Sequence, residues 1–482
     1  MEAEKQQKRG LLKDSSFYLL ATIITTAISF LTLPIYTRYL SPQDFGIVAL
    51  FFTFGSVTAG LLSIGIKTAS YRYYFQYKEN LQDFKVLNTS NLLFLLVCFM
   101  VSGIGIYHLA NWFSTILFDG KMTADIIRWS FLSGSMGYLL IYLSLLLTAQ
   151  SRAITYSAIT ILQVILNNGF SFYFIFAHSL TYLAKIYGLI LTQIVMLACL
   201  LFFTRNLFGF QFSLSSLKKS IRFSYPLIPR QTIGLIYSSF DRVMLNQYNG
   251  LTSVAYYTFG AKFANLLKMI FDSISKAWTP FIMEKLHENT EEARQHIVIR
   301  YFKIAFLLTC VGLGIIYFSE EVIKLLVTKE FYPSMFVVPV YVYLHLFLII
   351  NMIAMNQIMF SEKMFVLLPS SIVGITVNIL LNILLIPKYG PIGAAIATSL
   401  AALCGNSIML YYGFRVCPLP VSKRKLAGIF LITIAFTLPV YPIMVLDINL
   451  FVKLILKTTI IIVYVGSGIF LNYISIKDIK QV

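Results

Sequence analysis

The stretch from Arg222 to Pro280 reads RFSYPLIPRQTIGLIYSSFDRVMLNQYNGLTSVAYYTFGAKFANLLKMIFDSISKAWTP. Its hydropathy predicts two membrane helices joined by a short turn at Asn249-Gly250. Six ionisable residues lie at depths where a lipid-facing helix carries none: Arg230, Asp241, Arg242, Lys262, Lys268 and Asp272. A charge at the bilayer centre costs at least ~2.5–3.5 kcal/mol. We therefore expect the two helices to line a polar internal cavity.

The composition around this stretch is that of a polytopic membrane protein. Of the 482 residues, 58% are hydrophobic and only 12% are charged, whereas soluble domains have about 25% charged residues. A net charge of +18 would suggest nucleic acid as a partner of a soluble protein. Here the Lys and Arg side chains gather in loops that would face an anionic leaflet, so no nucleic-acid partner is expected.

Fourteen membrane spans are predicted, which gives an all-α polytopic fold without room for a soluble domain between spans. The charged N-terminus runs directly into the first span with no small-residue cleavage site, so a retained helix is expected rather than a signal peptide. The spans are 16–37, 45–66, 88–110, 127–149, 154–177, 186–204, 223–245, 253–275, 300–318, 335–360, 365–386, 391–413, 426–446 and 451–473.

The distribution of Lys and Arg predicts the orientation of these spans. With the N-terminus inside, the cytoplasmic segments hold 25 of them, the outer segments nine and the span interiors four. Cytoplasmic loops of membrane proteins carry such an excess. An even number of spans then places both termini on the cytoplasmic side of a bacterial or archaeal cytoplasmic membrane.

Weak internal repeats predict two similar lobes. Thr148-Ala-Gln-Ser-Arg152 has the register of Met359-Phe-Ser-Glu-Lys363 at an offset of 211 residues, and the same offset places Asn167 on Asn378. An offset of six helices implies lobes of parallel topology, related by an axis along the membrane normal. The expected parts are an N-lobe over 1–210, a C-lobe over 211–418, and two lipid-facing helices over 419–482 without charges in their middles.

On each of the two helices predicted in Arg222–Pro280, polar residues fall on one face when the sequence is projected at 100° per residue. Lys268 and Asp272 are four residues apart and are expected to pair with each other. The aligned sets are Arg230, Gly234, Tyr237 and Asp241 on the first helix, and Thr258, Lys262, Asn265, Met269, Asp272, Ser273 and Lys276 on the second. A Lys, an Asn and an Asp on one stripe favour a water-filled cavity over simple helix packing.

Motifs for catalysis or metal binding are missing from the sequence. It contains no GxSxG, HExxH or Walker A motif and no carboxylate pair at catalytic spacing, so we expect neither an enzyme nor a cofactor. The five cysteines form no CxxC pair and are interpreted as packing residues. His345 is interpreted as a hydrogen-bonded core residue, and the histidines predict no metal site.

Several segments together resemble the polysaccharide-type flippases of the multidrug/oligosaccharidyl-lipid/polysaccharide (MOP) exporter superfamily. The most similar branch is that of the Wzx-type O-antigen and capsule repeat-unit translocases. The resemblance covers nearly the whole chain, and the segments that carry it are Phe30-Leu-Thr-Leu-Pro34-Ile-Tyr-Thr-Arg38-Tyr-Leu-Ser-Pro-Gln-Asp44-Phe-Gly46, Ser224-Tyr-Pro226-Leu-Ile-Pro229, Asp241-Arg242, Ala255-Tyr-Tyr257 with Lys262, and Asn382-Ile-Leu-Leu-Ile-Pro387-Lys-Tyr-Gly390-Pro-Ile-Gly393-Ala-Ala.

The resemblance implies two six-helix lobes around a central cavity, two extra C-terminal helices and transport by alternating access. It implies an undecaprenyl-pyrophosphate-linked oligosaccharide as substrate, carried across membrane lipids from the inner to the outer leaflet. It also implies a substrate-contact role for Arg38 and Lys262. The polar stripes, independently, propose Arg230, Tyr237, Asp241, Arg242 and Asn265 for the same site.

Four alternatives remain open at this point, and one of them, a structural membrane protein, would not need the charges on the two helices predicted in Arg222–Pro280. A lipid II flippase would share the basic cavity, whereas a MATE-type drug or cation antiporter would need an acidic one. The charges inside spans are four basic against two acidic, which disfavours the antiporter. A glycan polymerase would need a larger outer loop. H⁺ or Na⁺ as a coupling ion and a glycan polymerase as a partner protein are further candidates, and the glycan itself cannot be read from the sequence.

Overall fold

The computed structural model describes residues 2–77, 79–446 and 448–474. The side chains of residues 2–15 and of Leu227, Arg230 and Ser238 lie outside this description. All regular elements in the described ranges are helical, which confirms the predicted all-α class. The chain divides into two compact units, 1–254 and 255–482, and each is treated by itself. The predicted lobe boundaries stay a prediction.

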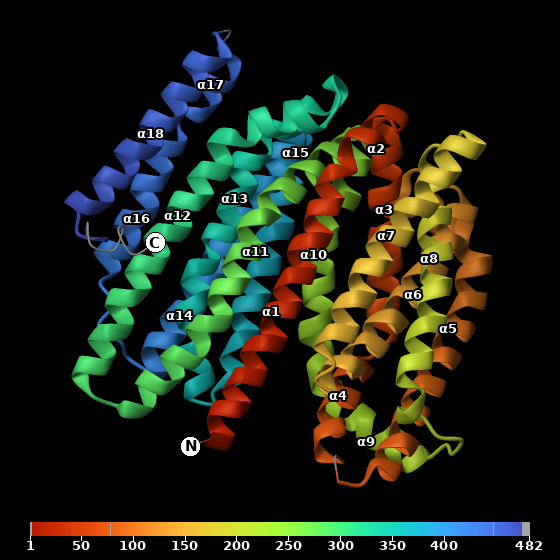
Figure 1. Cartoon of the computed structure of the whole chain (residues 1–482). Coiled ribbons are helices and arrows are strands. Elements are labelled where there is room, and N and C mark those ends of the chain that lie inside the picture. The colour runs from red at the N-terminus through yellow and green to blue at the C-terminus, as the bar shows by residue number, and fades with distance from the viewer. Residues whose placement is uncertain (1, 78, 447, 475–482) are drawn as a thin grey trace. The chain divides into compact units, whose positions relative to one another are not determined.

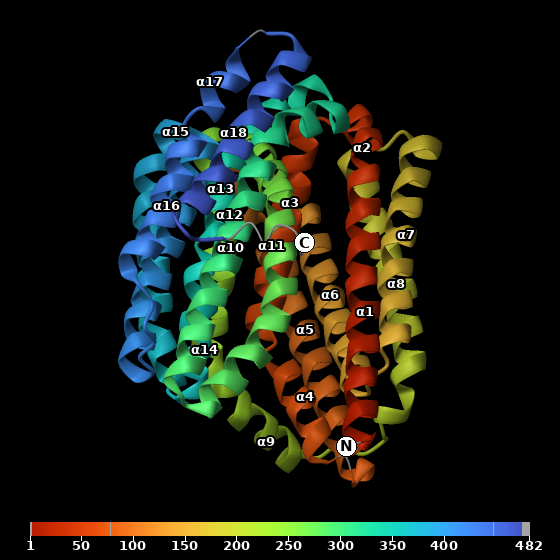
Figure 2. The same ribbon diagram turned by 60° about the vertical axis from the view of Figure 1, so that its left-hand side comes forward.

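Unit 1 is a bundle of long helices (Figures 1 and 2), in which α6 contacts α3, α5, α7 and α8, and α8 contacts α3, α6 and α7. Its elements are α1 (Glu2–Leu31), α2 (Leu33–Tyr39), α3 (Pro42–Leu62), α4 (Ile66–Gln76), α5 (Leu81–Phe118), α6 (Ala124–Ala149), α7 (Ala153–His178), α8 (Tyr182–Thr204), the 3-10 turn η1 (Arg205–Leu207), α9 (Leu214–Ser224), η2 (Tyr225–Leu227) and α10 (Ile228–Asn249).

Unit 2 is built around α12 and the long α15, and α11 contributes to it from Ala255 onward. Its elements are α11 (Leu251–Glu288), α12 (Glu291–Leu326), η3 (Lys329–Phe336), α13 (Val338–Leu346), α14 (Leu348–Phe360), η4 (Met364–Val366), α15 (Leu367–Val416), α16 (Lys423–Thr437), α17 (Val440–Val445) and α18 (Leu450–Phe470).

Every predicted span has a helix in the structure. Eleven helical segments in the described ranges are long and apolar enough to cross a membrane. One of them, Met364–Val416, contains two predicted spans, because Gly390 breaks α15 with φ 53° and ψ −130°. A positive φ is readily adopted by glycine. The other two predicted spans are α10 and α11, which are less apolar because they hold the charged residues singled out above.

Local sequence signals explain where several helices begin. Ser41 and Asp44 form a capping box at the start of α3, with the Asp44 amide donating to Ser41 Oγ over 3.2 Å and the Ser41 amide donating to Asp44 Oδ2 over 2.9 Å. Pro226 lies in η2, and Pro229 lies in the first turn of α10. Prolines are tolerated in a first turn, where the lost amide has no helical partner.

Two glycines bring α3 and α6 into backbone contact. A Cβ built on Gly134 would lie 2.1 Å from the carbonyl oxygen of Gly55, and one built on Gly55 would lie 2.3 Å from that of Ser130. No side chain fits at such distances. Small residues at helix interfaces allow this close approach in membrane proteins, so Gly55 and Gly134 fix the spacing of the two helices.

A chain of buried polar groups joins α11 to both halves of α15 in unit 2. The Tyr257 hydroxyl lies 3.4 Å from Thr398 Oγ1, Asn378 Nδ2 donates to the same oxygen over 3.3 Å, and Asn382 Nδ2 donates to Asn378 Oδ1 over 3.1 Å. All four residues are buried. Satisfied polar contacts of this kind hold helices together where water cannot compete.

A buried ion cluster joins α12 to α18. Lys453 and Lys457 on α18 donate to the Glu320 carboxylate on α12 over 2.7 and 2.8 Å. Glu320 is only 2% exposed, and Lys457 is fully buried. The sequence pattern singled out charges only on the two helices predicted in Arg222–Pro280 and did not indicate this cluster, which ties α18 to α12.

Candidate functional site

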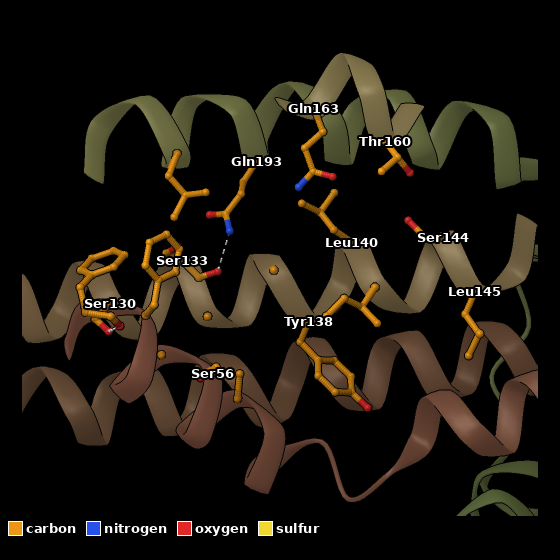
Figure 3. A pocket seen from close by; sticks show the side chains of 18 of the residues that line it. Ser56, Ser130, Ser133, Tyr138, Leu140, Ser144, Leu145, Thr160, Gln163 and Gln193 are labelled. Atoms are coloured by element: carbon orange, nitrogen blue, oxygen red, sulfur yellow. Dashed lines mark hydrogen bonds between the residues drawn. The ribbon is translucent and has the colours of Figure 1, made fainter. Parts of the chain in front are cut away.

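A cavity of about 500 Å³ opens within unit 1 among α3, α6, α7 and α8 (Figure 3). None of the described residues that line it carries a formal charge. Its polar groups are hydroxyls and amides, and its apolar groups include Phe51, Phe52 and Leu140. The polar residues of the lining are Ser56, Ser130, Ser133, Tyr138, Ser144, Thr148, Tyr156, Thr160, Gln163 and Gln193.

The polar groups are held from opposite walls of the cavity. Figure 3 shows Gln163, Gln193 and Thr160 reaching toward the side of α6 that carries Ser133 and Ser144. Gln193 Nε2 donates to the Ser133 carbonyl over 3.0 Å, which fixes the amide. The other amide atom, Gln193 Oε1, is buried and has no hydrogen-bond partner among the described residues. An acceptor held in this way suits a hydroxyl or N–H donor of a ligand.

The sequence contains a signal for this cavity that our prediction missed. Along α6, six of the ten residues that line it recur every three or four positions, which places these six on one helix face. They are Ser130, Gly134, Gly137, Ile141, Ser144 and Thr148. Because a stripe of small and hydroxyl residues also serves helix packing, the pattern alone did not separate a cavity wall from a packing face.

Four of the seven predicted site residues lie on α10, in unit 1. Asp241 is buried, at 2% exposure, and Tyr237 and Arg242 are partly buried. The backbone of Arg230 lies in the first turn of α10, and its side chain is outside the described part of the structure. α10 packs against α3, where Leu235 fills the space over Gly60. Arg38 lies exposed in the last turn of α2.

The other two predicted site residues lie on α11, in unit 2. Lys262 is partly buried. Asn265 bonds to the buried His345 of α13, whose Nε2 donates to Asn265 Oδ1 over 2.9 Å. This confirms that His345 is a hydrogen-bonded core residue. The predicted pair of Lys268 and Asp272 is also confirmed, at 2.5 Å, and both side chains are about half exposed.

The predicted site residues therefore fall into one set in each unit. Arg230, Tyr237, Asp241 and Arg242 share one helix, with Arg38 elsewhere in the same unit, and Lys262 and Asn265 share the next helix. Within unit 2, Asn265 is placed beside His345. That the two sets line one cationic cavity stays a prediction.

Comparison with known proteins identifies the family of the chain. Residues 11–287 match a family described as polysaccharide biosynthesis proteins. An uncharacterized membrane protein of Methanocaldococcus jannaschii is 23% identical over 511 aligned positions, which cover 98% of each chain.

Solved structures share the fold at low sequence identity. The inward closed lipid II flippase MurJ superposes with a TM-score of 0.72 at 15% identity, covering 96% of this chain and 99% of its own. An inward-facing MATE multidrug resistance transporter of the MOP superfamily reaches 0.62 at 15% identity, with 81% and 94% covered. A MOP superfamily transporter from Pyrococcus furiosus reaches 0.58 at 16% identity, with 85% and 96% covered. The chain thus has the fold of the MOP superfamily.

Proposed function

Because the chain belongs to the polysaccharide biosynthesis protein family, we propose that it is a lipid-linked oligosaccharide flippase. It moves undecaprenyl-pyrophosphate-linked repeat units of an O-antigen, capsule or exopolysaccharide from the inner to the outer leaflet of the cytoplasmic membrane. Transport proceeds by alternating access and involves no catalytic step on the substrate. The N- and C-termini lie in the cytoplasm.

The main support for this proposal is the position of Lys262. Its side chain is partly buried, and it lies in the middle of a chain that belongs to this family. A pyrophosphate cannot cross hydrocarbon unaided because of its negative charge. An ammonium group within a membrane protein neutralises such a charge through short, charge-assisted hydrogen bonds. Lys262, together with Arg230, Arg242 and Arg38, therefore holds the pyrophosphate during translocation.

The uncharged cavity of unit 1 supports an oligosaccharide as the second part of the substrate. Sugars present many hydroxyls and apolar ring faces, and the cavity offers hydroxyls, two glutamine amides and phenylalanine rings. The buried acceptor Gln193 Oε1 suits a sugar hydroxyl. A cationic drug would instead favour carboxylates in the lining, and none is present among the described lining residues.

A second candidate is transport of lipid II, the peptidoglycan precursor. The structural similarity to MurJ, with a TM-score of 0.72 over nearly the whole of both chains, favours it. Both candidates share a pyrophosphate on a polyprenyl chain and differ in the glycan. Transport assays with the two purified lipids in vesicles distinguish them, because only the true substrate is moved at a rate above that of empty vesicles.

The charge of Lys262 is the first feature to test. We expect Lys262→Arg to retain substantial glycan export, Lys262→Gln to lose roughly 10- to 100-fold because one charge-assisted hydrogen bond is removed, and Lys262→Glu to lose still more. The measurement is surface glycan per molecule of flippase in the membrane.

Lys268→Glu is the matched control, because Lys268 lies on the same helix but is half exposed and paired with Asp272. Surface ion pairs contribute about 0–1 kcal/mol, so export should stay near that of the parent. A Lys262→Glu chain that is fully expressed and exports as well as the parent would refute the cationic site at its central residue.

The proposed orientation predicts a labelling pattern. A cysteine placed at Asn249, the last residue of α10 before the turn to α11, should react with a membrane-impermeant thiol reagent added from outside. A cysteine placed at Ser216, in α9, should react only after the membrane is permeabilised. Labelling of intact cells in the reverse pattern would invert the topology.

A further inference from the structure

A second cavity, of about 320 Å³, lies in unit 2 where α12, α16 and the end of α18 meet. It is far in sequence from the proposed substrate residues. One side is apolar and the other is basic and polar. The residues that line it are Val298, Ile299, Phe302, Lys303, Pro420, Ser422, Lys425, Asn472, Tyr473 and Ile474.

The walls of this cavity are fixed by contacts beneath its surface. The Tyr473 hydroxyl donates to the Lys425 carbonyl over 3.0 Å, and its ring stacks on Phe306 with centroids 5.8 Å apart. Ser422 caps α16 by accepting from the Lys425 amide over 3.3 Å. The backbone that carries Lys425 is thereby held against the end of α18. The cavity is therefore a formed feature of the unit.

The two lysines come from different helices and give the cavity its chemistry. Lys303 is partly buried on α12, and Lys425 is exposed in the first turn of α16. Asn472 adds an amide and Ser422 a hydroxyl. Ammonium, amide and hydroxyl groups together are the donors that bind phosphate oxygens. Val298, Ile299 and Phe302 form an apolar floor beside them.

The level of the cavity along the helices points to a lipid ligand. Three predicted spans, 300–318, 426–446 and 451–473, have their cytoplasmic ends here, so the cavity lies at the cytoplasmic edge of the spans, near the height of the headgroups. Basic pockets between helices on the cytoplasmic side bind anionic headgroups. We propose that this cavity binds the phosphate headgroup of an anionic phospholipid of the cytoplasmic leaflet, with one acyl chain along α12.

The experiment measures lipid retention by the purified full-length protein in native mass spectrometry, with phosphatidylglycerol and phosphatidylcholine as probes. The parent should retain phosphatidylglycerol in preference to phosphatidylcholine. The double variant Lys303→Gln/Lys425→Gln should bind phosphatidylglycerol roughly 30-fold more weakly, because it loses the attraction of two basic side chains to the anionic headgroup. Ile299→Trp should reduce retention of phosphatidylglycerol without changing the charge, because the new ring fills the cavity.

Matched controls come from the same two helices. Arg300→Gln/Lys423→Gln removes two positive charges from α12 and α16 that do not line the cavity, and Leu325→Trp places a tryptophan at an exposed position at the opposite end of α12. Both should retain phosphatidylglycerol as the parent does. Thermal unfolding of each variant identifies any that fail to fold, and the conclusion then rests on the remaining cavity variant.

Three results would overturn the proposal. The first is equal retention of the two phospholipids by the parent. The second is a loss in the charge controls as large as in Lys303→Gln/Lys425→Gln. The third is displacement of phosphatidylglycerol by inorganic phosphate or by undecaprenyl phosphate at equal concentration, which would assign the cavity to a free anion or to the transported lipid. Glycan export does not enter this assay, so its outcome is independent of the proposed function.

Discussion

Replacing Glu320 by alanine is expected to destabilise unit 2 by about 3–5 kcal/mol, the typical cost of removing one partner from a buried ion pair. The Glu320 carboxylate accepts from Lys453 and Lys457 inside the protein, and from Lys324 at 2.7 Å nearer the surface. Without it, among the described residues, Lys453 keeps the Met444 carbonyl at 3.2 Å and Lys457 keeps Glu321 at 2.6 Å. Thermal unfolding in detergent measures the loss.

Lys324→Ala is the control, because its side chain is 42% exposed and contacts the same carboxylate. An exposed pair contributes about 0–1 kcal/mol, so this variant should unfold near the parent. Replacing the whole cluster by uncharged residues, as Glu320→Leu, Glu321→Gln, Lys453→Met and Lys457→Met, should restore most of the stability, because no buried charge is then left unpaired. If Glu320→Ala unfolds no earlier than Lys324→Ala, the cluster does not hold α18.

This cluster marks one limit of the sequence prediction. Lys453 and Lys457 lie in the first two turns of a predicted span, and Glu320 follows the end of another. Charges at the ends of a span are ordinarily solvated by lipid headgroups. The pattern therefore predicted charges that flank the membrane rather than a buried ion cluster. The three groups come together only because α18 packs along α12, a contact between residues more than 130 positions apart. Hydropathy along one helix contains no information about such a contact.

The helices followed from the sequence more directly than the contacts between them. Apolar length predicted fourteen spans, since a helix must cover the hydrocarbon thickness with apolar side chains; the structure has a helix at each, and twelve of them lie in segments apolar enough to cross a membrane. Ion pairs within one helix could be predicted from the spacing of their residues, and the pair of Lys268 and Asp272 is the clearest case. Asn265 was placed on a polar stripe by the sequence, and its partner His345 lies 80 positions away. That contact required the packing of α11 against α13.

The cavity of unit 1 shows the same limit for uncharged residues. Charged residues inside a span indicate a polar environment, because their burial in hydrocarbon is costly. Serines and glycines are common in spans and give no such indication. The stripe of small and hydroxyl residues on α6 therefore did not by itself predict a cavity. It lines a cavity only because Gly55 and Gly134 set the distance between α3 and α6, and because α7 and α8 close the other side.

Gly134→Ala is expected to lower the stability of unit 1 by about 1–3 kcal/mol, the usual cost of inserting a methyl group into a packed interface. The new Cβ would lie 2.1 Å from the Gly55 carbonyl oxygen and 2.6 Å from the Gly55 Cα. Those are backbone atoms, so no rotamer change relieves the clash, and α3 must move away from α6. The thermal unfolding midpoint should fall, and glycan export per folded molecule should fall with it, because the cavity changes shape.

Gly105→Ala, in the middle of α5, isolates the effect of the close approach from that of the substitution. A Cβ at this position meets nothing within 4 Å. Alanine there should be neutral or stabilise the helix by about 0.5–1 kcal/mol, because glycine loses more backbone freedom on folding. The two changes add the same methyl group to helices of the same unit and are expected to shift stability in opposite directions. Equal midpoints for Gly134→Ala and Gly105→Ala would show that α3 and α6 are not held in backbone contact, and that the cavity beside them does not depend on their spacing.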